Sequence, residues 1–230
     1  MVWALLIVAG LLLLWLVLRL ERKHRYQRKW QRYARQNGMQ YYPKAPAALI
    51  RALGRFNLLR HAKPEHLTHL LSLDQYPYRV TVMQHKQLLR LGTTRTPHAQ
   101  TIFYFDTGRA LLPDFELRPE YAITRPGKPL KAYDMPLADA SAFSRLFRLM
   151  SRSPKAVQPL FSDELKQFFQ NHRTYCIAVE GSKVIIYEPG IEISDKALPN
   201  KLRKAENILT TMTSAALRQS YARRQQKRAS

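Results

Sequence analysis

The residues that could carry chemistry in this chain are a closely spaced pair of histidines, a single cysteine and scattered serines. His66 and His69 lie three positions apart, whereas two metal ligands on one helix face commonly lie four apart. On a strand, their imidazoles would point to opposite faces. We therefore interpret both as surface histidines. Cys176 lies in an apolar stretch without a neighbouring base, which favours a buried, inert thiol over a nucleophile.

Other chemical signatures are missing from the sequence. Neither a Walker A pattern nor a GxGxxG pattern occurs among the eight glycines, and no serine lies in a GxSxG elbow. One cysteine cannot form the paired-cysteine half of a zinc site. We therefore predict no catalytic residue, no metal and no cofactor. An enzymatic function stays open only because active sites can be assembled from residues that are far apart in the chain.

A basic loop around Arg90 and Arg95 is the best remaining candidate for a binding site. With Thr93, Thr94 and Thr96, it could contact phosphate groups of a lipid or a nucleic acid. The alternative is an ordinary solvated hairpin tip.

The net charge of +22 is concentrated at the two ends of the chain. Residues 19–35 contribute +7, from eight Lys or Arg and one Glu, and residues 201–230 contribute another +7 in the same way. Segments of this kind are attracted to anionic lipid headgroups. The predicted headgroup contacts are Arg22, Lys23, Arg25, Arg28, Lys29, Arg32, Arg223 and Arg224.

The amino-terminal segment of the chain must position the first of these two basic regions. Residues 1–20 carry no charged side chain before Arg19, and a run of this length is typical of a transmembrane helix. Its predicted membrane residues are Val2, Trp3, Leu5, Leu12, Trp15 and Leu18. A cleaved signal peptide is the alternative, but nothing basic precedes the apolar run and Leu18–Leu20 is a poor cleavage site.

The charge asymmetry predicts the orientation of this span. Eight basic residues follow the apolar run at once, so the positive-inside rule places the amino terminus outside and the bulk of the chain in the cytoplasm. Residues 21–37 are predicted to be a basic juxtamembrane helix. On it, Tyr26, Trp30 and Tyr33 share one face, which either lies against headgroups or packs on the following domain.

Residues 38–217 are predicted to be one α+β domain with an antiparallel sheet and a long C-terminal helix. Alternating patterns indicate strands at 66–73, 78–89 and 99–107, and the turn Gly181-Ser182 indicates a hairpin over 175–188. Ser162 is a plausible N-cap for a helix that contains Phe168 and Phe169. Residues 143–150 fit strand or helix. An amphipathic helix is expected over 195–217, and residues 218–230 are expected to be a disordered basic tail.

The anchor with its basic stalk, followed by LPDFELRPE, LFSDELKQFF and EGSKVIIYEPG, resembles a family of uncharacterised bacterial single-pass membrane proteins. The resemblance implies a bacterial inner-membrane location and no functional residue. We therefore expect a non-enzymatic, membrane-anchored interaction domain with an unknown protein partner. A membrane-tethered nucleic-acid-binding protein is the alternative, and it is less favoured because no nucleic-acid motif occurs in the domain.

Overall fold

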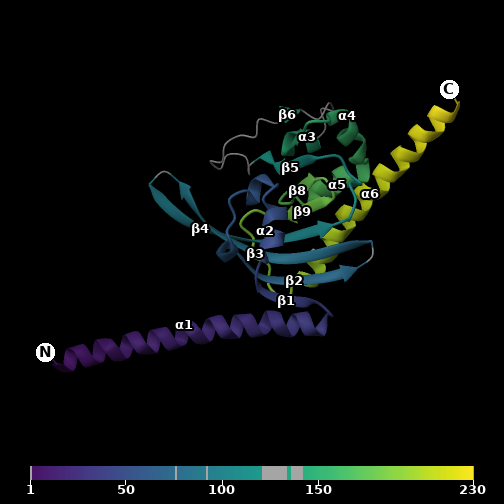
Figure 1. The fold of residues 1–230 in the computed structure, drawn as a ribbon. Coiled ribbons are helices and arrows are strands. Elements are labelled where there is room, and N and C mark those ends of the chain that lie inside the picture. Colours follow the sequence, from purple (N-terminus) through teal and green to yellow (C-terminus); the bar gives the residue numbers. More distant parts are fainter. Residues whose placement is uncertain (1, 76, 92, 121–133, 136–141, 230) are drawn as a thin grey trace.

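The computed structural model describes residues 2–75, 77–91, 93–120, 134–135 and 142–229 (Figure 1). The helices are α1 (Val2–Gln36), α2 (Ala47–Leu53), α3 (Ala142–Leu146), α4 (Pro154–Val157), α5 (Asp163–Asn171) and α6 (Leu198–Ala229), with the 3-10 helices η1 (Asn57–Leu59), η2 (Pro64–His66) and η4 (Gln158–Leu160). The strands are β1 (Gln40–Lys44), β2 (Leu67–Gln75), β3 (Tyr78–Leu91), β4 (Thr94–Asp106), β5 (Phe115–Pro119), β6 (Asp134–Met135), β7 (Phe147–Ser151), β8 (Cys176–Glu180) and β9 (Lys183–Tyr187).

The strands form one antiparallel sheet in the order β1-β2-β3-β4-β9-β8-β5-β7-β6 over the described part of the chain. Short turns connect β2 to β3, β3 to β4 and β8 to β9, because antiparallel neighbours can be joined by two-residue loops. Gly181 has a φ of +61°, the left-handed conformation that the β8–β9 turn requires. The predicted α+β class, with an antiparallel sheet and a long C-terminal helix, is confirmed.

One face of the sheet packs against α1, α3, α5 and α6. Strand residues that alternate toward this side, such as Val80, Val82, Phe103 and Phe105, are fully buried there. Helix α5 begins at its predicted cap, because the Ser162 hydroxyl accepts a hydrogen bond from the Leu165 N–H. This face carries the main apolar core.

The opposite face of the sheet packs against α2 and η1 (Figure 1). Leu53, Phe56 and Leu59 from this segment are buried against Met83 and Ile102 of the strands. Helix α2 ends at Gly54, whose N–H donates a hydrogen bond to the Ile50 carbonyl. The sheet is therefore covered by helices on both faces over most of its width.

The carboxyl half of α1 packs on the domain, which settles the two alternatives for its aromatic residues. Trp30 is 2% exposed, and Tyr26 and Tyr33 pack against the same core. The helix ends where Gly38 adopts a φ of +65°. The aromatic stripe is thus a packing surface and is not spread over headgroups.

The prediction of a transmembrane helix, and with it the single-pass inner-membrane location with the amino terminus outside, is wrong. Among the residues that the structure describes, no helix is long and apolar enough to cross a bilayer. Within the part of α1 whose side chains the structure describes, the apolar run from Gly10 ends at Leu18 after nine residues, about half of the length that a span needs. Arg19 and Glu21 follow Leu18 closely, and the same unbroken helix then becomes strongly charged up to Gln36. No helix boundary lies between residues 20 and 21.

Three further elements differ from the sequence predictions. Helix α6 continues to Ala229, so residues 218–229 are helical and not disordered. Residues 89–98 are not a loop, because β3 and β4 stay paired as far as Leu91 and Thr94. Residues 143–150 contain both structures, the end of α3 followed by β7. The expected proline-rich connector at 123–140 lies almost wholly outside the described residues.

Candidate functional site

Cys176 is placed where the sequence predicted, in a strand and away from solvent. It is fully buried in β8, and this burial raises the pKa of its thiol to about 12. A thiol with a raised pKa is protonated at neutral pH and is a poor nucleophile. The structure therefore gives this cysteine a packing role.

The two spaced histidines do not form a joint site. The His66 ring accepts a hydrogen bond from the Lys63 backbone N–H at η2, whereas His69 Nδ1 lies 2.8 Å from the Tyr41 hydroxyl. His69 has a φ of +52° at the irregular register between Thr68 and Leu71, which turns its side chain toward α1. Within the described ranges, no three His, Cys, Asp or Glu side chains are grouped to hold a metal ion.

A third histidine, which the sequence did not single out, is buried at the centre of the sheet. His85 has no exposed surface, and its Nδ1 lies 3.3 Å from Nε2 of Gln100. Its Nε2 has no hydrogen-bond partner. Burial, with smaller contributions from His66 and His98, lowers the pKa of His85 to about 4, so that the imidazole is neutral at pH 7.

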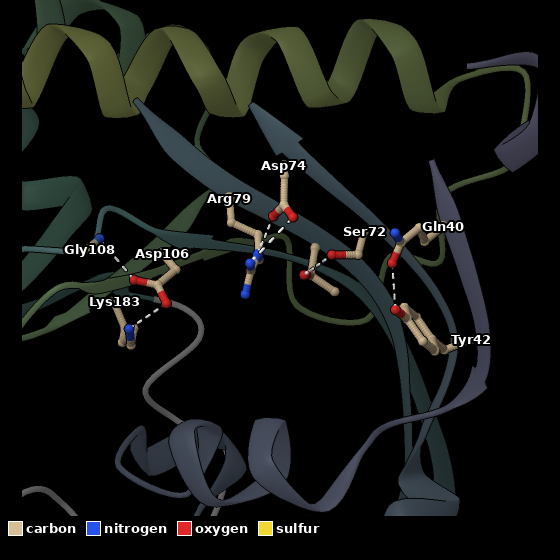
Figure 2. Close-up of polar contacts among 9 residues, drawn as sticks. Gln40, Tyr42, Ser72, Asp74, Arg79, Asp106, Gly108 and Lys183 are labelled. Carbon is tan, nitrogen blue, oxygen red and sulfur yellow. Dashed lines mark hydrogen bonds and ion pairs between the residues drawn. The ribbon is translucent and has the colours of Figure 1, made fainter. Parts of the chain in front are cut away.

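An open cleft of about 440 Å³ lies at the β2–β3 turn and the end of β4. Three of its lining residues, Asp74, Arg79 and Asp106, belong to a row of charged residues that crosses the sheet. Successive cross-strand partners in this row have opposite charges: Asp74, Arg79, Asp106, Lys183 and Glu180. Figure 2 shows the first four side chains and their contacts.

Each carboxylate of this cleft is bound by a neighbouring basic side chain. Arg79 donates two hydrogen bonds to Asp74, and Lys183 Nζ lies 2.5 Å from Asp106 (Figure 2). Burial would raise the pKa of Asp106, but the bonds from Lys183 and from the Gly108 N–H lower it below its ordinary value. Opposite charges in register stabilise a sheet. We interpret the row as a structural ladder and not as a catalytic group.

The strongest candidate for a binding site is the distal part of the β3–β4 hairpin, residues 86–100, which we call the arm. Strand β2 pairs with β3 up to the partners Leu67 and His85, and β9 pairs with β4 up to Tyr187 and Ile102. Beyond these points, the described strands β3 and β4 pair with each other alone. Figure 1 shows the resulting two-stranded ribbon extending away from the body of the domain.

The arm is basic and partly apolar. It contains Lys86, Arg90 and Arg95, and no Asp or Glu occurs between residues 75 and 105. Leu88 is 63% exposed. The register makes Arg90 the direct partner of Arg95, and like charges opposite one another destabilise a strand pair. These features are typical of a surface that binds an anionic partner.

The base of the arm is held by the connection between β9 and α6. The Ile191 carbonyl accepts a hydrogen bond from the Thr101 N–H at 2.9 Å, and the Ile193 N–H donates to the Thr101 hydroxyl at 2.8 Å. Glu192 Oε1 lies 2.9 Å from Lys86 Nζ and 2.8 Å from the Tyr26 hydroxyl. This connection therefore joins the arm to α1.

The residues predicted to lie in a membrane are all on α1. Leu12, Trp15 and Leu18 are exposed, and the Arg19 guanidinium lies 5.1 Å from the Trp15 ring. The side chains of Val2, Trp3 and Leu5 lie outside the described part. Their assignment to a transmembrane span is not supported.

The residues predicted to contact headgroups are divided between α1 and α6. Arg25, Arg28, Lys29 and Arg32 are exposed on α1, where Arg25 pairs with Glu21 and Lys29 with Asp195. The side chains of Arg22, Lys23, Arg223 and Arg224 are outside the described part. Contact of any of them with lipid headgroups stays a prediction.

Comparison with known proteins adds information on the fold. No family model matches the chain, and no curated protein matches it significantly. Among solved structures, it is similar to the mycobacterial trehalose monomycolate transport factor A, TtfA, with a TM-score of 0.55 and 8% sequence identity. The match covers 83% of this chain and 93% of that one. At this identity the likeness concerns the fold alone, and it places the chain in no family.

Proposed function

We propose that this chain is a non-enzymatic interaction domain that binds a protein partner through the arm. The single observation that carries the proposal is the geometry of β3 and β4, which leave the sheet together and continue as a ribbon whose described strands pair only with each other. A two-stranded ribbon is marginally stable alone, so an extended one is typical of an element that gains contacts on binding.

The state of the reactive groups supports the non-enzymatic part of the proposal. The Cys176 thiol is buried with a raised pKa, and the imidazole of His85 is enclosed within the sheet. In the open cleft, Asp74 and Asp106 are each paired with a cation. General acid–base work needs a titratable group that can reach a substrate, and these groups are buried or already bound.

The composition of the arm favours a protein over a nucleic acid. Along β3, residues 86–91 hold three leucines and two cations, and one of those cations, Lys86, already pairs with Glu192. Nucleic-acid interfaces are much more positively charged than protein interfaces, whose centres are apolar. An exposed Leu88 beside isolated cations fits the protein class better.

Site-specific photocrosslinking in the native cell tests the proposal. A benzophenone amino acid replaces Leu88 in the full chain, and the matched control carries it at exposed Arg51 on α2. We expect a protease-sensitive, nuclease-resistant adduct at position 88 that is weakened by the double change Arg90→Glu and Arg95→Glu. An adduct destroyed by nuclease would favour nucleic-acid binding. Equal adducts at both positions would show that the arm is not the site.

A further inference from the structure

We propose that the outer edge of β3, over residues 86–91 of the arm, binds an acidic peptide of the partner as an added β-strand. This inference rests on the proposed function and deepens it, because it names the surface and the chemistry of the bound segment. In strand addition, backbone hydrogen bonds supply affinity and the alternating side chains supply specificity.

Over residues 86–91, the outer edge of β3 is not paired with any described strand. Strand β2 covers β3 up to His85, and there the preceding chain leaves the extended conformation as the 3-10 helix η2, which contacts β3 without pairing with it as a strand. No described strand continues the line of β2 along residues 86–91. In an antiparallel ribbon, every second residue directs its N–H and C=O away from the partner strand. These outward groups of β3 face the position that an added strand would take.

Other strand edges of the sheet are less suited to pairing with an added strand. In β4, Pro97 has no N–H, and the edge at Thr101 is already bound to Ile191. At the end of the sheet, β1 contains Pro43 among its five residues. By contrast, residues 86–91 contain no proline. At about 3.3 Å per residue, they offer about 20 Å of continuous backbone.

The charge of the arm indicates the chemistry of the bound segment. No acidic residue occurs between positions 75 and 105, where the arm carries Arg90 and Arg95, whereas Lys86 already pairs with Glu192 and Arg79 with Asp74. Charge complementarity therefore favours glutamate or aspartate in the added strand. Leu88 is exposed and shares a strand face with Lys86 and Arg90, so we expect an apolar residue between two acidic ones on that face of the added strand. Pairing of the same edge with a second copy of this chain is disfavoured, because it would bring two basic strands together.

The experiment uses hydrogen exchange of the full chain, followed residue by residue by NMR. The probe is the capped heptapeptide Thr-Glu-Thr-Val-Thr-Glu-Thr, which places Glu, Val and Glu on one strand face, and its control has the same sequence with every second amide N-methylated. We expect the probe to slow exchange of alternate amides in residues 86–91 by at least ten-fold, with no new protection in residues 94–98. The methylated peptide should give no protection, because it keeps the charge but lacks the donors.

Matched variants separate strand addition from simple charge attraction. The change Arg90→Glu with Arg95→Glu should weaken binding of the probe at least ten-fold. The control change Arg51→Glu with Lys155→Glu alters two exposed cations elsewhere by the same net charge and should have less than a two-fold effect. Equal losses in both, or binding without protection of β3, would overturn the inference.

The outcomes also separate this inference from the proposed function. A protein adduct from position 88 without protection of β3 by the probe would overturn strand addition and keep the arm as the contact site. If position 88 gave no protein adduct and the probe gave no protection, strand addition and the proposed function would both be overturned. Displacement of the probe by single-stranded nucleic acid at physiological salt, with tighter binding, would overturn both in favour of a nucleic-acid partner.

Discussion

Arg90 of β3 is the direct cross-strand partner of Arg95 of β4. At the other end of the same two strands, Arg79 lies opposite Asp106, and the alternation of charge continues from there across the sheet. One like-charged pair occurs elsewhere, between Arg118 and Arg148, but each of these arginines has its own carboxylate, Glu116 and Glu120 respectively. The arm has no acidic residue in its own sequence, and the carboxylate that pairs with its Lys86 is Glu192, from the connection between β9 and α6.

Replacing one arginine of this pair should stabilise the arm. Arg95→Glu places opposite charges in register, and such pairs contribute about 0.2–1 kcal/mol. We expect amide exchange in residues 86–98 to slow by up to about five-fold, measured in the full chain without peptide. Arg95→Gln removes the repulsion alone and should give a smaller change in the same direction. Faster exchange in the glutamate variant would contradict the cross-strand register.

The packing of α5 gives a prediction for the core. Phe169 has no exposed surface and contacts the rings of Phe143, Phe147 and Phe161, so Phe169→Ala should lower the free energy of unfolding by about 3–5 kcal/mol. Phe168 is half-buried, and we expect Phe168→Ala to cost about 1–2 kcal/mol because only part of its ring leaves water. Denaturant unfolding of both variants measures the difference, and a larger loss at Phe168 would contradict the assigned faces.

The buried imidazole of His85 should make stability depend on pH. Its pKa falls from 6.5 to about 4 in the folded chain, so between these pH values the unfolded chain binds more protons than the folded one. The free energy of unfolding should therefore rise with pH over this window, by at most about 1.4 kcal/mol per pH unit. The comparison is with His85→Gln, whose amide can still bond to Gln100. Identical slopes for the two proteins would show that His85 is protonated in the folded state.

The local structure could be predicted where short patterns decide it. The turn Gly181-Ser182 defined the β8–β9 hairpin, and the Ser162 hydroxyl defined the start of α5. In each case, a turn or cap depends on residues within a few positions of one another. The same holds for the inert state of Cys176, because its neighbours in the chain are apolar.

The site itself depends on contacts between distant parts of the chain, and the sequence could not show them. Residues 89–98 were interpreted as a loop, whereas cross-strand pairing carries β3 to Leu91 and β4 from Thr94 through Pro97. Tyr26 and Glu192 lie 166 positions apart. The net charge at the ends could be counted, but whether the basic half of α1 was free or packed on the sheet required the fold.

The link between α1 and the arm leads to a prediction about Glu192. Its carboxylate accepts from the Tyr26 hydroxyl and pairs with Lys86, whose Nζ also lies 5.6 Å from the Tyr26 ring. Burial would raise the pKa of Glu192, but these bonds lower it, so the carboxylate stays charged in the folded chain. Glu192→Gln keeps one acceptor for Tyr26 and removes the ion pair. We expect a loss of about 1 kcal/mol, because partly exposed pairs are worth little more.

The readout of this variant is the place where protection is lost. If Glu192 joins the two elements, amide exchange should accelerate by about five-fold both in α1 near Tyr26 and at the base of the arm near Lys86, while β8 and β9 stay unchanged. The matched control is Glu164→Gln, which removes an exposed carboxylate from α5. Acceleration confined to α1 would mean that the arm is held by the backbone bonds of Thr101 alone and moves independently of α1.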